Sequence, residues 1–155
     1  MSKVSQHSKV IFLIAVLCYL VGLAAGYFLD INLGLEISIS GENIIAVVVV
    51  AFFISILFFG IGSTAASFIF GYLHSKAIAV QLTNAIYFIP FFISVYSAIL
   101  LGTSAWNDAA GKENLMPVLK KSIALFLLAI GISIAVMLAE PYLGEISSII
   151  GSIWS

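Results

Sequence analysis

The sequence has 155 residues, of which 63% are hydrophobic and only 8% are charged, and its net charge is −1. Soluble domains carry roughly 25% charged residues, so this composition argues against a soluble fold and predicts a single integral membrane domain. All six basic residues are lysines, and the near-neutral charge offers no basic surface for nucleic acid. We therefore expect the lipid bilayer, and no nucleic acid, as a partner.

Four apolar segments are long enough to cross a bilayer, which needs about 20 residues of helix. They predict an all-α, polytopic protein. A cleaved signal peptide is the competing interpretation of the first segment, because the chain begins with a basic stretch. The three later segments favour a retained helix. The predicted segments are residues 10–29, 44–73, 77–101 and 118–139.

Residues 31–40 break the helical pattern. Ile31, Leu33, Leu35, Ile37 and Ile39 alternate with polar residues or glycine, and a period of two is typical of a strand. A single strand is unstable without a partner. We expect either an extended loop on the bilayer surface or an edge to which another chain pairs.

The second segment, 44–73, is longer than one perpendicular crossing requires and is rich in small residues. Small side chains four residues apart form a smooth face along a helix, where another helix can approach closely in lipid. Two glycines also weaken a helix, so we expect either a steep tilt or a break near Gly60 and Gly62. The residues of this seam are Gly60, Gly62, Ser63, Thr64, Ser67 and Gly71. His74 follows, and we expect its side chain at the membrane interface.

The third segment, 77–101, contains Asn84, Pro90 and Ser94 within an apolar context. Proline removes one helical hydrogen bond and clashes with the preceding turn. One interpretation is a kinked, tightly packed helix. The other is a broken or re-entrant helix that lines a site, as in transporters.

Beyond the last segment, apolar residues of 142–154 recur at helical spacing and the opposite face is polar. This pattern predicts an amphipathic helix lying at the membrane interface.

The distribution of lysine predicts the topology. Lys3 and Lys9 place the N-terminus in the cytoplasm. If 77–101 crosses the bilayer fully, Lys112, Lys120 and Lys121 lie outside, against the charge rule. If the chain instead re-enters at Pro90, all six lysines lie inside. The sequence is compatible with both arrangements.

No catalytic motif is present. The sequence holds no paired cysteines, no metal-binding HExxH motif and no phosphate-binding loop, so we expect no catalytic residues, no metal and no cofactor. The carboxylates all lie in loops or at segment ends, whereas ion and proton carriers usually keep one within the membrane.

From about Ile44 to Tyr142 the order of features resembles the stage II sporulation protein M-like membrane family. The resemblance rests on the segment FFGIGSTAASFIFGYLHSKA, on Ile89-Pro90 opening an apolar segment, and on the ending Ala139-Glu140-Pro141-Tyr142. The sequence departs from the family where a Pro-His-Gly motif is common, since Pro90 is followed by Phe91-Phe92. The resemblance implies a non-enzymatic membrane subunit.

The leading hypothesis is a non-enzymatic membrane scaffold, or a subunit of a larger assembly in the cell membrane. Its partners are other membrane subunits or further copies of itself. The alternative is a small transporter or channel with a pathway near Gly60 and Pro90. The candidate pathway or packing residues are Gly60, Gly62, Ser63, Thr64, Ser67, Gly71, Asn84, Pro90 and Ser94.

Overall fold

The computed structural model describes residues 3–29, 39–80, 82–111 and 114–154, with side chains for 6–29, 39–78, 84–111 and 114–142. Apart from short connections these residues are helical, as predicted. The predicted strand, 31–40, lies outside the described residues except at its last two positions. The elements are α1 (Lys3–Phe28), α2 (Ile44–Ile56), the 3-10 turn η1 (Leu57–Gly60), α3 (Gly62–Val80), the 3-10 turn η2 (Leu82–Tyr87), α4 (Phe88–Ala109) and α5 (Leu115–Trp154).

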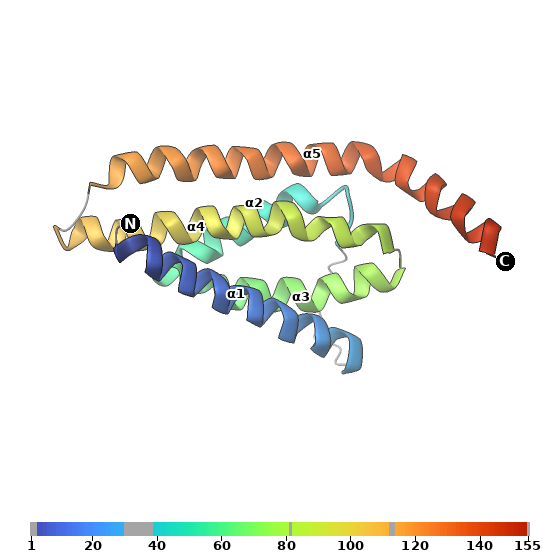
Figure 1. Ribbon diagram of the computed structural model, residues 1–155, viewed down its shortest axis with the longest axis horizontal. Helices are drawn as coiled ribbons and strands as arrows, with labels where there is room; N and C mark the ends of the chain where they lie inside the picture. The colour runs from blue at the N-terminus through green and yellow to red at the C-terminus, as the bar shows by residue number, and fades with distance from the viewer. Residues whose placement is uncertain (1–2, 30–38, 81, 112–113, 155) are drawn as a thin grey trace.

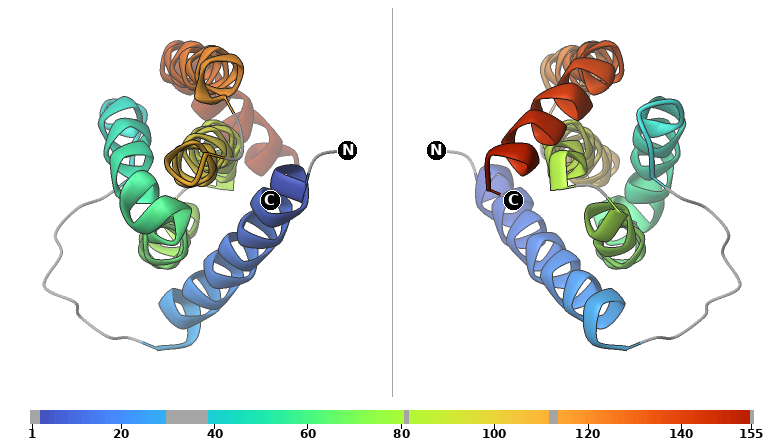
Figure 2. Two further views of the ribbon diagram at one scale, coloured as in Figure 1. Left: turned by 90° about the vertical axis from the view of Figure 1, so that its left-hand side faces the viewer. Right: turned by 90° about the vertical axis from the view of Figure 1, so that its right-hand side faces the viewer.

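Helix α4 lies at the centre of the bundle, with α1, α2, α3 and α5 arranged around it (Figures 1 and 2). In an apolar stretch of 18 residues within the span that contains α4, 56% of the residues are buried, compared with 22% in the matching stretches of α1 and α5. The central position explains the composition of α4. Three buried hydroxyls of α4 face different neighbours. Ser94 bonds to the backbone of α2, Ser97 to the backbone of α5, and Thr103 to a side chain of α1.

Successive helices run in opposite directions, so the chain has two ends in space (Figure 1). Hydrogen bonds from Ser8 to Thr103 and from Ser97 to Ser122 place the start of α1, the end of α4 and the start of α5 together. We call this the basic end, after its exposed lysines Lys9, Lys120 and Lys121. The opposite end, which holds Glu42, Lys76 and Glu140, is the acidic end.

Helices α1 and α3 run parallel and touch through small residues. A Cβ atom added at Gly71 would collide with the backbone oxygen of Tyr19, and one added at Gly22 would collide with the backbone oxygen of Phe68. A Cβ added at Gly26 would likewise collide with the backbone oxygen of Tyr72 and the hydroxyl of Ser75. Backbones can approach this closely only because the side chains are absent, which is the usual basis of helix association in lipid.

The apolar segment 44–73 is not one helix, which corrects the predicted boundaries. The chain reverses at η1, where Phe58 and Phe59 have φ of 53° and 58° and Gly60 has φ of 99°. Only glycine adopts this left-handed region without cost, whereas a bulky residue there costs about 1–3 kcal/mol. Gly102 of α4 lies against the turn, and a Cβ added there would come within 2.8 Å of the Gly60 nitrogen. The predicted break near Gly60 is therefore a complete reversal.

The third predicted segment, 77–101, is also divided. Its first residues end α3, η2 follows, and α4 begins at Phe88 and continues without a kink past Pro90. Pro90 is the third residue of α4. Backbone N–H groups in the first turn have no carbonyl partner within the helix, so a proline there removes no helical hydrogen bond. The chain therefore neither breaks nor re-enters at Pro90. It turns before it, at η2.

The C-terminal region likewise differs from the prediction. Residues 142–154 do not form a separate helix, because α5 continues through Pro141 to Trp154 as one helix of 40 residues. Its last part extends beyond the other helices (Figure 1). By length and composition, three described helices could span a membrane: Gln6–Phe28, Asn84–Ala109 and Leu115–Tyr142. A shorter apolar stretch, Ile44–Gly60, precedes α3.

The contact between α1 and α3 yields a stability prediction. Gly71→Val should destabilise the protein by roughly 1–3 kcal/mol, because the added methyl groups overlap the α1 backbone and the helices must separate. Thermal unfolding of the protein in detergent measures the change. Gly131→Val on α5 is the matched control, since nothing lies within 4 Å of a Cβ at that position. Equal melting temperatures for the two variants would contradict the predicted contact.

Candidate functional site

A buried histidine links three parts of the bundle. His74 of α3 is fully buried, and its Nδ1 lies 2.8 Å from the hydroxyl of Tyr19 on α1. Its Nε2 lies 2.8 Å from the backbone oxygen of Asn84 in η2. A carbonyl oxygen only accepts, so Nε2 carries a hydrogen. In the neutral imidazole Nδ1 then accepts from the Tyr19 hydroxyl, and both ring nitrogens are bonded.

Asn84 extends this arrangement. Its Nδ2 donates to the backbone oxygen of Ala77 at 2.9 Å, which ties η2 back to α3. Its Oδ1 is buried without a partner among the described residues. Asn84 therefore fixes the turn that leads into α4, and one buried acceptor of the site remains available.

The expectation that the side chain of His74 lies at the interface is wrong. Its ring is buried among aromatic neighbours and tilted against them, with centroid distances of 5.0 Å to Phe70 and 6.0 Å to Tyr19. Sequence reasoning also missed Tyr19, which is 55 positions away from its partner. The available signal was that polar groups in a membrane protein pair with one another, but that rule does not identify the partner.

A second polar contact joins η2 to α5 at the acidic end. The hydroxyl of Tyr87, the last residue of η2, donates to Glu140 Oε1 of α5 at 2.8 Å. A Cβ at Gly41 would collide with the same carboxylate, so the chain entering α2 lies directly on it. Tyr87 is 1% exposed and Glu140 is half-buried, so this contact between η2 and α5 is partly enclosed.

The predicted site residues fall in three separate places. Gly60 lies in the reversal, and Gly62 and Thr64 follow it in the first turn of α3, where the Thr64 hydroxyl donates to the Ile61 oxygen at 2.8 Å. Asn84 and Pro90 lie at the other end of the bundle. The remaining ones are buried in helix contacts: Ser63, Ser67, Gly71 and Ser94.

These buried residues do not converge on a common opening. The Ser94 hydroxyl donates to the backbone oxygen of Val48 at 2.9 Å and so joins α4 to α2. The Ser63 and Ser67 hydroxyls are fully buried and have no partner among the described residues. The structure therefore does not assemble the nine residues into one site.

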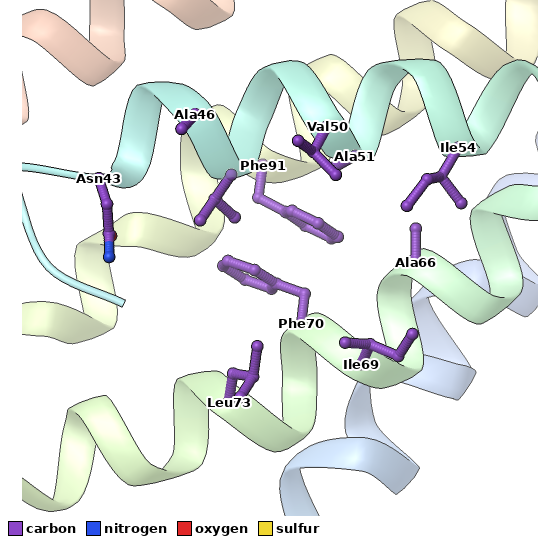
Figure 3. Close-up of a pocket in the computed structure, with 11 residues that line it drawn as sticks. Asn43, Ala46, Val50, Ala51, Ile54, Ala66, Ile69, Phe70, Leu73 and Phe91 are labelled. Atoms are coloured by element: carbon purple, nitrogen blue, oxygen red, sulfur yellow. The ribbon is translucent and has the colours of Figure 1, made fainter. Parts of the chain in front are cut away.

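An apolar groove lies between α2 and α3 (Figure 3). Its volume is about 290 Å³, and Phe70 and Phe91 form its floor, with ring planes 6° apart and centroids separated by 3.7 Å. Asn43 is the one polar residue in its lining. The apolar lining residues are Ala46, Val47, Val50, Ala51, Ile54, Ala66, Ile69, Phe70, Leu73 and Phe91.

The comparisons with known proteins give no relative. No protein-family model matches the chain, and neither a curated protein nor a solved structure matches it.

The site offers two kinds of chemistry. Within the described residues, no group of three or more His, Cys, Asp or Glu side chains is arranged to hold a metal ion. The His74 network joins helices through neutral hydrogen bonds in the protein interior. The groove, in contrast, is open and apolar, so it suits a hydrocarbon ligand or an apolar part of a partner.

The His74 network predicts a specific loss of stability. Tyr19→Phe should cost about 1–3 kcal/mol, because the buried Nδ1 of His74 loses its donor. Thermal unfolding in detergent tests this, with Tyr27→Phe as the matched control on the same helix, where the side chain is 74% exposed. A loss for Tyr27→Phe as large as that for Tyr19→Phe would show that the His74 bond contributes nothing specific.

Proposed function

We propose that this protein is a multi-pass protein of the cell membrane that acts as a non-enzymatic scaffold or subunit of a larger membrane assembly. Its partners are other membrane subunits or further copies of the chain. The N-terminus and the basic end face the cytoplasm, and the acidic end faces outward.

The distribution of side chains supports the membrane location. Large apolar residues are exposed along α1 and α5, for example Leu13 and Leu127 at 60% each. Serines and a histidine, by contrast, are fully buried. Water favours the opposite arrangement, whereas in a bilayer exposed apolar side chains contact lipid and polar groups face other helices.

The observation that carries the subunit role is that the small and polar residues are used in contacts between helices. Gly71 contacts the backbone of α1, Gly60 contacts α4, and Ser94 bonds to α2. A transport pathway needs such groups to line a polar opening. Here the described groove is apolar, so the geometry favours attachment to other membrane components.

Two further features support the same role. The end of α5 projects beyond the other helices, where a partner can reach it (Figure 1). The resemblance of residues 44–142 to the stage II sporulation protein M-like family also favours a membrane subunit without catalytic activity.

The distribution of charge supports the orientation. Lys9, Lys120 and Lys121 lie at the basic end, and Lys76 is the described lysine of the acidic end. The positive-inside rule thus places the basic end in the cytoplasm. The reversal at η1 is the cause, because it divides the predicted segment 44–73 into two helices of opposite direction. The start of α5, with Lys120 and Lys121, then lies at the same end as the N-terminus.

This topology can be tested by labelling single cysteines with a membrane-impermeant reagent in a Cys18→Ser background. Exposed positions are available in Glu42→Cys and Lys76→Cys at the acidic end and in Ala110→Cys at the basic end. We expect the first two to label from the outside of intact cells and the third only after permeabilisation. Labelling of positions 42 and 76 from opposite sides would restore the four-segment topology and contradict the reversal across the membrane.

The subunit role predicts a stable complex. Purification in mild detergent, followed by determination of the particle mass and its proteins, should give a particle larger than one 16.6 kDa chain. Liposomes containing the protein should pass ions and small solutes no faster than empty liposomes. A monomer that conducts a solute would overturn the proposal and support a transporter.

One observation keeps the transporter as a second candidate. Five buried polar atoms have no partner among the described residues, namely the hydroxyls of Ser55, Ser63, Ser67 and Ser104 and the Oδ1 of Asn84. Helices are also interrupted at η1 and η2, as in transporters whose interrupted helices bind substrate. Flux in the liposome assay that is lost in Asn84→Leu would favour this candidate.

A further inference from the structure

The groove between α2 and α3 is long and too small to enclose a helix. Its lining runs along α2 from Asn43 to Ile54, which is about 16 Å at the helical rise of 1.5 Å per residue. Over that length an α-helix about 10 Å in diameter occupies roughly 1,300 Å³, so a groove of about 290 Å³ is too small to enclose a partner helix.

The polarity of the groove changes along its length. Asn43 lies at the acidic end, next to Glu42 and close to the chain that contacts Glu140. Beyond Asn43 the lining is entirely apolar (Figure 3). A ligand that fits this gradient has one polar end and one hydrocarbon chain, since a few polar groups set the orientation of a ligand in an apolar pocket.

The position of the groove identifies the source of such a ligand. The groove begins at the acidic end, at the boundary of the proposed membrane, and extends about 16 Å inward, close to half of the roughly 30 Å hydrocarbon core. Its rim residues Val50 and Ile69 are 54% and 42% exposed, so it opens sideways where lipid surrounds the protein. The floor is fixed, because Phe70 and Phe91 are buried and stacked.

We propose that this groove binds one hydrocarbon chain of a bilayer phospholipid from the outer leaflet, with the headgroup beside Asn43. The inference rests on the proposed membrane location. The chain lies along α2 and against the stacked rings of Phe70 and Phe91. The bound lipid fills the space that α2 and α3 leave between them and is part of the surface that the protein presents in the membrane.

The test uses the full chain reconstituted into phosphatidylcholine vesicles that contain a phosphatidylcholine with a photoreactive diazirine in its acyl chain. After irradiation, mass spectrometry of the digested protein locates the label. We expect the peptides of the groove to carry about tenfold more label than that around Leu128 of α5. That ratio corresponds to about 1.4 kcal/mol of preferential binding. Val50 and Leu128 are 54% and 51% exposed, so exposure does not account for a difference.

Variants test whether the groove itself holds the chain. Ala66→Phe fills the interior of the groove, and its matched control is Ala65→Phe, one residue along α3 and exposed. Ala46→Phe blocks the exposed rim and keeps the test valid if Ala66→Phe does not fold. We expect both groove variants to lose the preferential label, while Ala65→Phe keeps it.

Each other outcome overturns the lipid site. Equal labelling of all exposed helices, or an unchanged pattern in Ala46→Phe, shows that the groove has no preference for lipid. Cross-links from groove residues to another protein chain, in place of lipid, assign the groove to a partner. Extraction of the protein by alkaline carbonate, with no lipid label on any helix, instead refutes the membrane location, so the two failures are distinguishable.

Discussion

The architecture depends on the left-handed turn at Phe58–Gly60. Two phenylalanines adopt a backbone conformation that costs about 1–3 kcal/mol each, and the surrounding structure must offset that cost. Gly102 allows α4 to approach the turn closely, while Phe59 packs on Trp106 with ring centroids 4.7 Å apart. Without this reversal α2 and α3 would form one long helix, and the order of the helices, the two charged ends and the groove would all be lost.

The same reversal explains how the polar groups are accommodated. It directs α3 back along α1, where Gly22, Gly26 and Gly71 bring the backbones together. This contact places His74 beside Tyr19, and the histidine in turn holds η2 through the backbone of Asn84. These two bonds of His74 therefore connect the interior from α1 through α3 to the turn that precedes α4.

The proposed functions follow from what the helices leave uncovered. Small residues were candidates for a pathway, but at Gly60, Gly71 and Ser94 they make contacts within the bundle. The remaining accessible features are the apolar outer surfaces, the projecting end of α5 and the groove above Phe70 and Phe91. Such features suit lipid and protein partners in a membrane better than a dissolved substrate, because they offer apolar contact and few polar groups.

Composition and local pattern by themselves determined the helical class, the membrane-length apolar helices and the weak point near Gly60, because these depend on neighbouring residues. The tertiary structure decided how the weak point is used. A glycine permits a kink or a full reversal equally well, and the contact with Gly102 selects the reversal. The pairing of Tyr19 with His74 and of Tyr87 with Glu140 joins residues 55 and 53 positions apart, and no local pattern encodes such distances. The groove likewise exists only once α2 and α3 lie side by side, because its walls belong to separate helices.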